Sequence, residues 1–345
     1  MKNSAKRVGS ILYLLFTLAL VVVLGTATGD VWGAWHALLR VQPQWLLAAL
    51  GCWSGFILFR AAALMFYCGQ QNRPLTFFGA MRVTIIGQYY SGVTPAATGG
   101  QPMQVYELTR CSISPSIGTV AVLVETFGFQ IAHMLLATIL WILYRAPIRR
   151  LLVGVHWVMV LGYAANMLWS ALLALIFLKS GSVGGVLDKC VRLLARLRIV
   201  RDPERITSRV RTHAEDFHQV VRLLLKRPAL MVAALLFSTA QALSYFSILY
   251  FIYRGFGWDA RPYGLILAIQ TLMHLSASIA PTPGASGAQE GAFYLFFRWI
   301  FPERSLFPAL LVWRFFTYYF MLLVGAVTIA FGVLTGSGRR RRSPR

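Results

Sequence analysis

The residues best suited to chemistry lie in two short stretches rich in proline, glycine and small side chains. The first covers residues 95–101 and the second covers 283–289; Pro, Ala, Thr or Ser, Gly and Gln match between them at a constant offset of 188 residues. Glycine lets a backbone approach a ligand closely. A helix that starts after such a stretch presents unpaired N–H groups and the positive end of its dipole. The chemistry that this favours is binding of an anion such as a phosphate.

Seven residues of these stretches form the candidate anion-binding set. Thr98 and Ser286 stand where a helix N-cap is expected, and Pro102 suits the first turn of a new helix. The full candidate set is Thr98, Gly99, Gly100, Gln101, Ser286, Gly287 and Gln289. The alternative interpretation is that these small residues only let helices pack closely.

Three carboxylates lie in or beside apolar stretches, where a buried charge is costly and commonly functional. Glu290 lies about one turn after the break within the second stretch, and Glu107 lies later in its own interrupted stretch, so both are candidate intramembrane charges. At the same offset Glu125 falls beside Arg314, which predicts a structural Glu125–Arg314 ion pair.

Other polar residues carry weaker signals. Arg60 and Arg82 lie near the ends of apolar stretches, where snorkelling accounts for them or a lipid phosphate could meet them. His274 is either a satisfied polar residue or part of a proton relay. No nucleophile–base pair stands out, and the cysteines lack metal-ligand spacing. The sequence therefore predicts no catalytic residue, no metal and no cofactor.

The composition indicates which elements must position these residues. Apolar residues make up 57% of the 345-residue chain and charged residues only 13%, against about 25% charged in typical globular proteins. This excludes a soluble enzyme and a disordered chain. The 33 basic residues outnumber the 11 acidic ones, but most lie outside the apolar runs. Nucleic acid is therefore not an expected partner.

Apolar runs of about 20 residues predict membrane-spanning helices. The runs are 11–28, 45–66, 119–144, 151–178, 229–253 and 307–334. Two further stretches, 77–108 and 263–301, are apolar but interrupted by Pro and Gly, which favours hairpins that enter and leave on one side. The predicted fold class is an all-α polytopic membrane protein with about six full spans plus two broken re-entrant helical hairpins in an inverted-repeat arrangement.

The distribution of basic residues sets the expected orientation. Cytoplasmic loops are enriched in Lys and Arg, so the N-terminus, the basic linker 179–228 and the Arg-rich C-terminus are expected in the cytoplasm of a cell-membrane protein. The linker pattern fits an amphipathic helix on an anionic membrane surface, or a solvated connector helix. The short basic loop 145–150 then falls outside, against the rule.

The predicted repeat has two span–hairpin–span units within one membrane domain, 1–345. They cover 45–144 and 229–335, and parity gives them opposite topology. Inverted repeats with paired broken helices are the architecture of many secondary transporters, which bind substrate where the breaks meet.

At these residues the sequence resembles the lysylphosphatidylglycerol synthase transmembrane-region family, a flippase-like membrane domain. The resemblance covers roughly residues 45–334. The motifs that carry it are Gly87-Gln88-Tyr89-Tyr90, Pro95, Gly99-Gly100-Gln101-Pro102, Tyr106-Glu107-Leu108, Val122-Leu123-Val124-Glu125, Pro281-Thr282-Pro283-Gly284, Gly287, Glu290-Gly291 and Trp313-Arg314. It implies handling of phospholipids with polar headgroups. The family's synthase activity belongs to a large cytosolic domain fed by aminoacyl-tRNA, for which the stretches 179–228 and 335–345 are too short.

The leading hypothesis is a flippase or transporter for a phospholipid or lipid-linked substrate such as lysyl-phosphatidylglycerol. Here the two breaks bind the headgroup phosphate, and Glu290 and Glu107 meet a cationic group or carry a proton. A second hypothesis is a phosphatidylglycerol lysyltransferase that uses lysyl-tRNA. A third is a non-catalytic membrane subunit that docks a separate synthase through the linker.

Overall fold

The computed structural model describes residues 36, 39–70, 74–178, 228–278 and 280–334. Within these ranges every regular element is helical and no strand occurs. The predicted span 11–28, residues 179–227 of the basic linker and the Arg-rich tail lie outside the described residues. The described part therefore has the architecture of a polytopic helical membrane protein.

Four helical runs are long and apolar enough to cross a membrane. They are α3 (Pro43–Gly69), α6 (Pro115–Leu143), the Met231–Gly255 part of α11 (Pro228–Gly255), and the run Glu303–Leu334. The last run joins α14 (Glu303–Arg314), the π-helical segment Phe315–Tyr319 and α15 (Phe320–Leu334). These helices match four of the predicted spans. A fifth apolar run forms α8 (His156–Leu178), preceded by the short α7 (Arg145–Leu151).

Each of the two interrupted stretches folds into a helical hairpin. In the first, α4 (Phe77–Val93) and α5 (Gly100–Arg110) pack together around the 3-10 turn Pro95–Ala97. In the second, α12 (Tyr263–Ala277) and α13 (Ala288–Phe297) pack around the 3-10 turn Pro283–Ala285. The helices break where the sequence predicts, because each turn starts with a proline that lacks an N–H donor.

The repeat extends to the backbone conformation of the two turns. Ala96 and its counterpart Gly284 have φ of 50° and 57°, and Ala97 and its counterpart Ala285 have φ of 55° and 49°. Two successive residues in the left-handed region are unusual, particularly where three of the four carry a Cβ. The two turns are therefore equivalent in local structure as well as in sequence.

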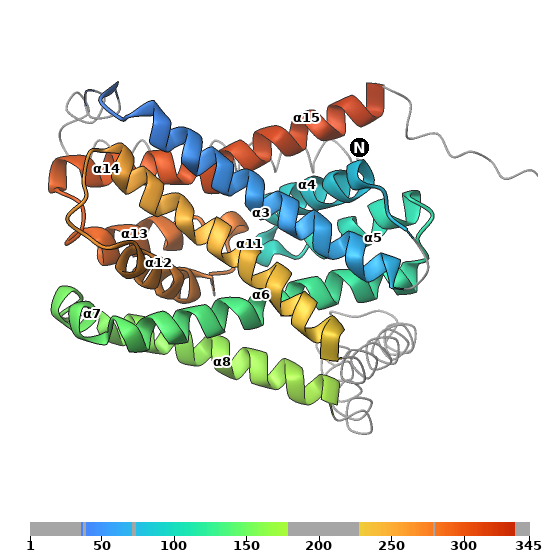
Figure 1. Cartoon of the computed structure of the whole chain (residues 1–345), viewed down its shortest axis with the longest axis horizontal. Helices are drawn as coiled ribbons and strands as arrows, with labels where there is room; N and C mark the ends of the chain where they lie inside the picture. The colour runs from blue at the N-terminus through green and yellow to red at the C-terminus, as the bar shows by residue number, and fades with distance from the viewer. Residues whose placement is uncertain (1–35, 37–38, 71–73, 179–227, 279, 335–345) are drawn as a thin grey trace, which may run out of the picture.

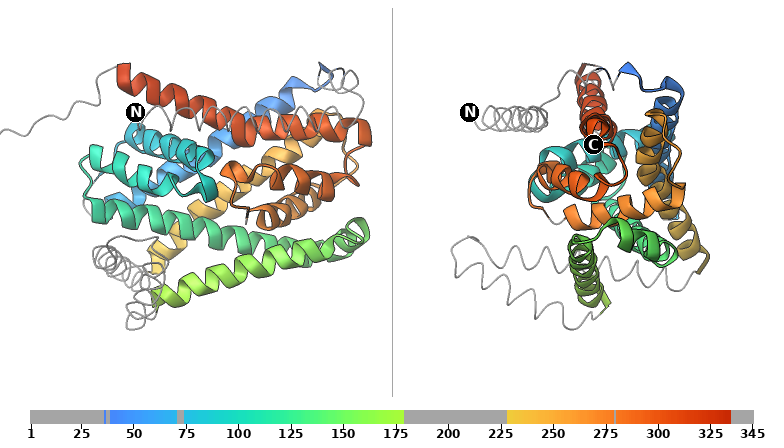
Figure 2. Two further views of the ribbon diagram at one scale, coloured as in Figure 1. Left: turned by 180° about the vertical axis from the view of Figure 1, so that it is seen from behind. Right: turned by 90° about the vertical axis from the view of Figure 1, so that its left-hand side faces the viewer.

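The turns of the two hairpins meet inside the molecule. The backbone N–H of Ala96 donates to the carbonyl oxygen of Pro281 at 3.2 Å. Around this contact α3 packs along α11 (Figure 1), α11 packs on α6, and α15 packs on α4. The left view of Figure 2 places both hairpins between the α14–α15 run and α6. Residues far apart in the sequence are thereby brought to one central place.

Candidate functional site

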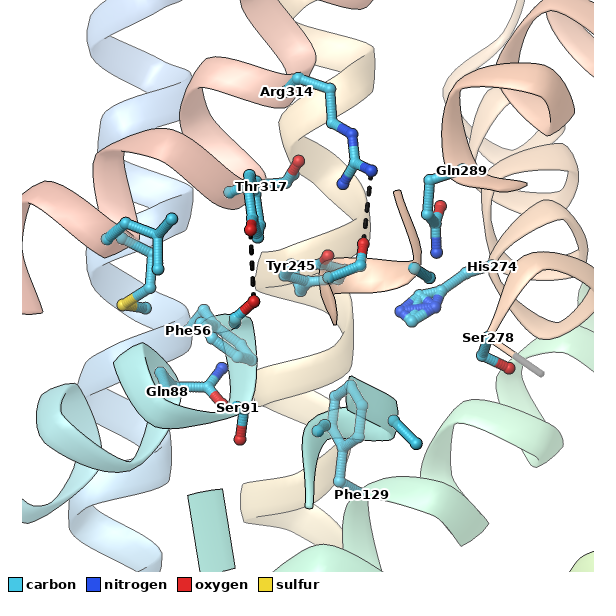
Figure 3. Close-up of a pocket in the computed structure, with 18 of the residues that line it drawn as sticks. Phe56, Gln88, Ser91, Phe129, Tyr245, His274, Ser278, Gln289, Arg314 and Thr317 are labelled. Atoms are coloured by element: carbon cyan, nitrogen blue, oxygen red, sulfur yellow. Dashed lines mark hydrogen bonds between the residues drawn. The ribbon is translucent and has the colours of Figure 1, made fainter. Parts of the chain in front are cut away.

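A cavity of about 380 Å³ lies where the two hairpin turns meet. Its lining comes from both turns and from α3, α4, α5, α6, α11, α12, α13 and the Glu303–Leu334 run (Figure 3). Ala96 and Ala97 of the first turn and Gly284 and Ala285 of the second belong to the wall. The equivalent parts of the two repeat units therefore build a single site.

The cavity sits at the middle of the four candidate spans along their length. Phe56 and Phe129 line it and are the central residues of α3 and α6. Tyr245 and Thr317 also line it, and each lies within two residues of the centre of its candidate span. A helix rises about 1.5 Å per residue, so all four spans present this site at nearly the same depth.

Two arginines supply formal positive charge to the wall, and no aspartate or glutamate occurs among the described residues that line it. Arg314 is 4% exposed, and its Nε donates to Glu290 Oε1 at 2.5 Å. Its Nη2 donates to the carbonyl oxygen of Gly284 at 3.3 Å, which is the dashed line at Arg314 in Figure 3. The guanidinium also lies over the rings of Trp313 and Tyr318, at 5.5 and 5.2 Å. Arg314 is thus fixed by an ion pair, a carbonyl and two aromatic faces.

The second arginine of the wall is Arg60 of α3. Its Nη2 donates to Glu125 Oε2 at 2.8 Å, and Gln241 donates to the other carboxylate oxygen at 3.1 Å. Glu125 is 1% exposed and does not line the cavity. Each repeat unit therefore places one arginine on the cavity with a buried carboxylate behind it.

The predicted Glu125–Arg314 pair is wrong, because each of these residues has another partner. Packing of α3 against α6 brings Arg60 to Glu125, and packing of α13 against α14 brings Glu290 to Arg314. A repeat offset identifies equivalent positions. Contact also depends on how the helices of each unit pack, which the offset does not contain.

The predicted N-caps are also corrected. Gly99 and Gly287 are the N-caps of α5 and α13, in place of Thr98 and Ser286. Gly287 donates its N–H to Glu290 Oε2 at 2.6 Å, and Thr98 donates its hydroxyl to the Pro95 carbonyl at 3.0 Å. Ser286 is not the cap because Gly287, with φ of 88°, is not yet helical, so the helix begins one residue later at Ala288.

The predicted site residues divide into two groups. Gln101, Gln289 and Arg314 line the cavity. The others lie outside its lining: Thr98, Gly99, Gly100, Ser286, Gly287, Glu107, Glu125 and Glu290. Glu107 is 4% exposed, accepts a hydrogen bond from Arg110 at 2.9 Å and forms an ion pair with Arg82 at 3.2 Å. The anion-binding roles of the turn residues stay predictions.

Several polar atoms of the lining residues are buried without a hydrogen-bond partner. These atoms are Arg60 Nε, Gln104 Nε2, His274 Nδ1, Gln289 Oε1 and Trp313 Nε1. Three of them are donors, and unpaired buried donors are uncommon in folded proteins. The wall is therefore rich in donors, which suits an acceptor-rich ligand.

Sequence reasoning missed most of the aromatic and amide lining. Gln104 could have been found, because it lies three residues after Gln101 and thus on the same face of a helix. Phe56, Phe129 and Tyr245 carry no local signal, since they look like ordinary core residues of apolar helices. In the described ranges no group of three or more His, Cys, Asp and Glu side chains is placed to hold a metal ion.

Comparison of the sequence with known proteins finds other membrane proteins. A UPF0104 membrane protein of Archaeoglobus fulgidus is 22% identical over 331 residues, with 87% of this chain and 90% of the relative covered. The sequence model of the lysylphosphatidylglycerol synthase TM region matches residues 10–325. Because that match covers nearly all of the chain, the protein belongs to the lysylphosphatidylglycerol synthase transmembrane-region family.

Proposed function

We propose that this chain is a lipid transporter that moves a phosphate-headed lipid between the leaflets of the cell membrane. The observation that carries the proposal is the arginine-lined cavity at the middle of four candidate spans. A lipid headgroup that crosses a bilayer needs polar partners at mid-depth, because unpaired polar groups are costly there.

The wall of the cavity supports binding of a phosphate. Guanidinium groups present several N–H donors in a planar fork that suits phosphate oxygens. Arg314 uses Nε and Nη2 for Glu290 and Gly284, and Nη1 remains as a further donor. Gln88, Gln101 and Ser91 add neutral polar groups to the same wall.

The proposed mechanism follows from the two hairpins. We place both in the membrane as re-entrant elements within about six full spans, with both termini cytoplasmic. Irregular backbone is tolerated at that depth only when it is buried in protein or lines a polar cavity, and here both turns line one. Rocking of the two inverted units about the meeting point of Ala96 and Pro281 would then open the cavity to each side in turn.

The test is lipid translocation in proteoliposomes. The purified chain is reconstituted with headgroup-labelled phosphatidylglycerol, and a membrane-impermeant reductant measures the fraction that has changed leaflet. We expect exchange well above that of protein-free vesicles. A rate equal to that of protein-free vesicles would contradict the proposal.

A matched pair of variants ties the movement to the cavity. Gln88→Leu removes a polar group from the wall at similar volume, and Gln44→Leu makes the same change at an exposed position of α3 outside the lining. A hydrogen bond to a charged group contributes about 1.5–3 kcal/mol, so the first variant should slow exchange about tenfold or more. Equal lipid exchange rates for the two variants would mean that the lipid headgroup does not pass through this cavity.

The lysyltransferase alternative has its own readout. Lipids are extracted from an expressing host that makes no lysyl-phosphatidylglycerol. New lysyl-lipid in the extract would contradict a transporter without synthase activity, and its absence alongside exchange in vesicles supports the transporter. Co-purification of a synthase subunit that is lost on deletion of 179–228 would support the docking alternative.

A further inference from the structure

We infer that the cavity selects a lipid whose headgroup is negatively charged and rejects a headgroup that carries an amino group. This inference rests on the proposed transport function and names its substrate class. It starts from the charge of the wall, where both formal charges are guanidinium groups, Arg60 and Arg314, and where no described lining residue is acidic.

The buried carboxylates nearest the cavity are not available to a cationic ligand. Both oxygens of Glu290 are engaged, by Arg314 Nε and by the N–H of Gly287. Both oxygens of Glu125 are engaged as well, by Arg60 and by Gln241. Neither carboxylate lines the cavity, so a ligand amine would compete with these protein donors, and breaking either ion pair would leave a charge unpaired at high cost.

The carboxylate of the first hairpin is occupied in the same way. Glu107 accepts a hydrogen bond from Arg110 through one oxygen, forms an ion pair with Arg82 through the other, and lies outside the lining. The cationic partner expected of Glu107 and Glu290 on sequence grounds is therefore supplied by the protein's own arginines. A ligand in the cavity can therefore pair with Arg60 and Arg314, which line it.

Aromatic rings are the other groups that bind cations, and those of the cavity already have partners. The guanidinium of Arg314 lies over Trp313 and Tyr318. Phe56 packs against Phe129 and Tyr245, with ring centroids 6.4 and 5.1 Å apart. Two of the aromatic rings of the wall therefore already carry a cation that the protein supplies.

The two arginines are the charged groups that a lipid headgroup meets among the described residues of the wall. Arg60 lies beyond the middle of α3 toward its C-terminus, and Arg314 lies before the middle of the Glu303–Leu334 run. These two helices run in the same direction in Figure 1, so the two arginines occupy positions on opposite sides of the helix midpoints. An amine on this wall meets guanidinium groups of like charge, whereas a phosphate can pair with them.

The inference is tested with three labelled lipids that share acyl chains and differ in headgroup charge. Phosphatidylglycerol carries one negative charge, phosphatidylethanolamine is neutral overall, and lysyl-phosphatidylglycerol carries a net positive charge at neutral pH. We expect exchange rates in that order, with about tenfold or more between the first and the last, because like charges in a buried site cost at least that much.

The outcomes separate this inference from the function on which it rests. If lysyl-phosphatidylglycerol moves as fast as phosphatidylglycerol or faster, the headgroup selectivity is wrong while lipid transport stands. If none of the three lipids moves faster than in protein-free vesicles, the transport function is wrong and the selectivity falls with it.

A charge-adding variant tests the cause of the selectivity. Gln101→Glu places a carboxylate on the wall at an exposed residue of α5, and Gln44→Glu adds the same charge at an exposed residue outside the lining. The first should shift the rate ratio toward lysyl-phosphatidylglycerol by about threefold or more, and the second should leave it unchanged. An equal shift in both would overturn the inference, and Gln88→Glu repeats the test if Gln101→Glu does not fold.

Discussion

Ala96 donates its backbone N–H to the carbonyl oxygen of Pro281. This hydrogen bond joins the two helical hairpins, whose turns correspond to each other at an offset of 188 residues. The bond places the two repeat units in direct contact at the cavity. Movement of one unit against the other must therefore change or pivot about this contact.

A cross-link at this contact should stop transport. N and O are 3.2 Å apart, so the two residues are direct neighbours, as a disulfide between them requires. In a cysteine-free background, Ala96→Cys with Pro281→Cys should lose lipid exchange on oxidation and regain it on reduction. The single variants should be insensitive to oxidant. Full exchange in the cross-linked protein would contradict relative movement at this point.

Variants of the buried ion pair Glu290–Arg314 should affect protein stability and lipid transport differently. Glu290→Gln or Arg314→Gln alone leaves an unpaired buried charge and should cost about 3–5 kcal/mol of unfolding free energy. The double variant should recover much of that stability, because neither charge remains. It should still fail to transport, since Arg314 lines the cavity. Thermal unfolding in detergent and vesicle exchange are measured on all four proteins; a double variant that transports normally would exclude Arg314 from binding.

The substitutions Ala96→Gly and Gly284→Ala, at equivalent positions of the two turns, should have different effects on stability. An L-residue in the left-handed region costs about 1–2 kcal/mol, so Ala96→Gly relieves strain and should lose no stability. In Gly284→Ala the new Cβ would also clash with the ring of Tyr318, so a loss of about 2 kcal/mol or more is expected. Melting temperatures of the two variants check this, and equal shifts would contradict the turn geometry.

The packing of α8 can be tested at one glycine. A Cβ on Gly162 would meet the backbone Cα of Ser276 in α12, whereas a Cβ on Gly51 in α3 has no atom within 4 Å. Gly162→Ala should therefore destabilise by about 1–3 kcal/mol. Gly51→Ala should be neutral or stabilising, since alanine favours helix by up to about 1 kcal/mol. The same melting assay decides, and a neutral Gly162→Ala would contradict contact between α8 and α12.

The expected orientation is tested by labelling two ends of α6. Ala146 follows α6 in α7 and Ser116 lies in its first turn; both are exposed. In a cysteine-free background, Ala146→Cys should react with a membrane-impermeant maleimide in intact cells. Ser116→Cys should react only after permeabilisation. The reverse pattern would put the termini outside the cytoplasm.

Sequence reasoning predicted the helices and the breaks because both have local causes. Runs of apolar residues define α3, α6 and α11, and the prolines at 95 and 283 end the preceding helices. The match between the two stretches also predicted a shared central place. These features follow from composition and backbone chemistry over a few residues.

The side-chain partners could not be predicted in the same way. Arg60 reaches Glu125 across 65 residues and Glu290 reaches Arg314 across 24, and both distances depend on which helices pack. The cap at Gly287 depends on a positive φ that Ser286 does not adopt. The role of Arg60 on the cavity likewise emerges only when α3, α6 and α11 are placed together.

The two arginine–glutamate pairs have a consequence for energetics across the membrane. Two positive and two negative charges sum to zero, so these four residues add no net charge to the empty site. A lipid with one negative charge then carries that charge across the membrane potential. The electrical work is about 2.3 kcal/mol for each 100 mV. An inside-negative potential would drive such a lipid toward the outer leaflet, and the unloaded protein would return without electrical work.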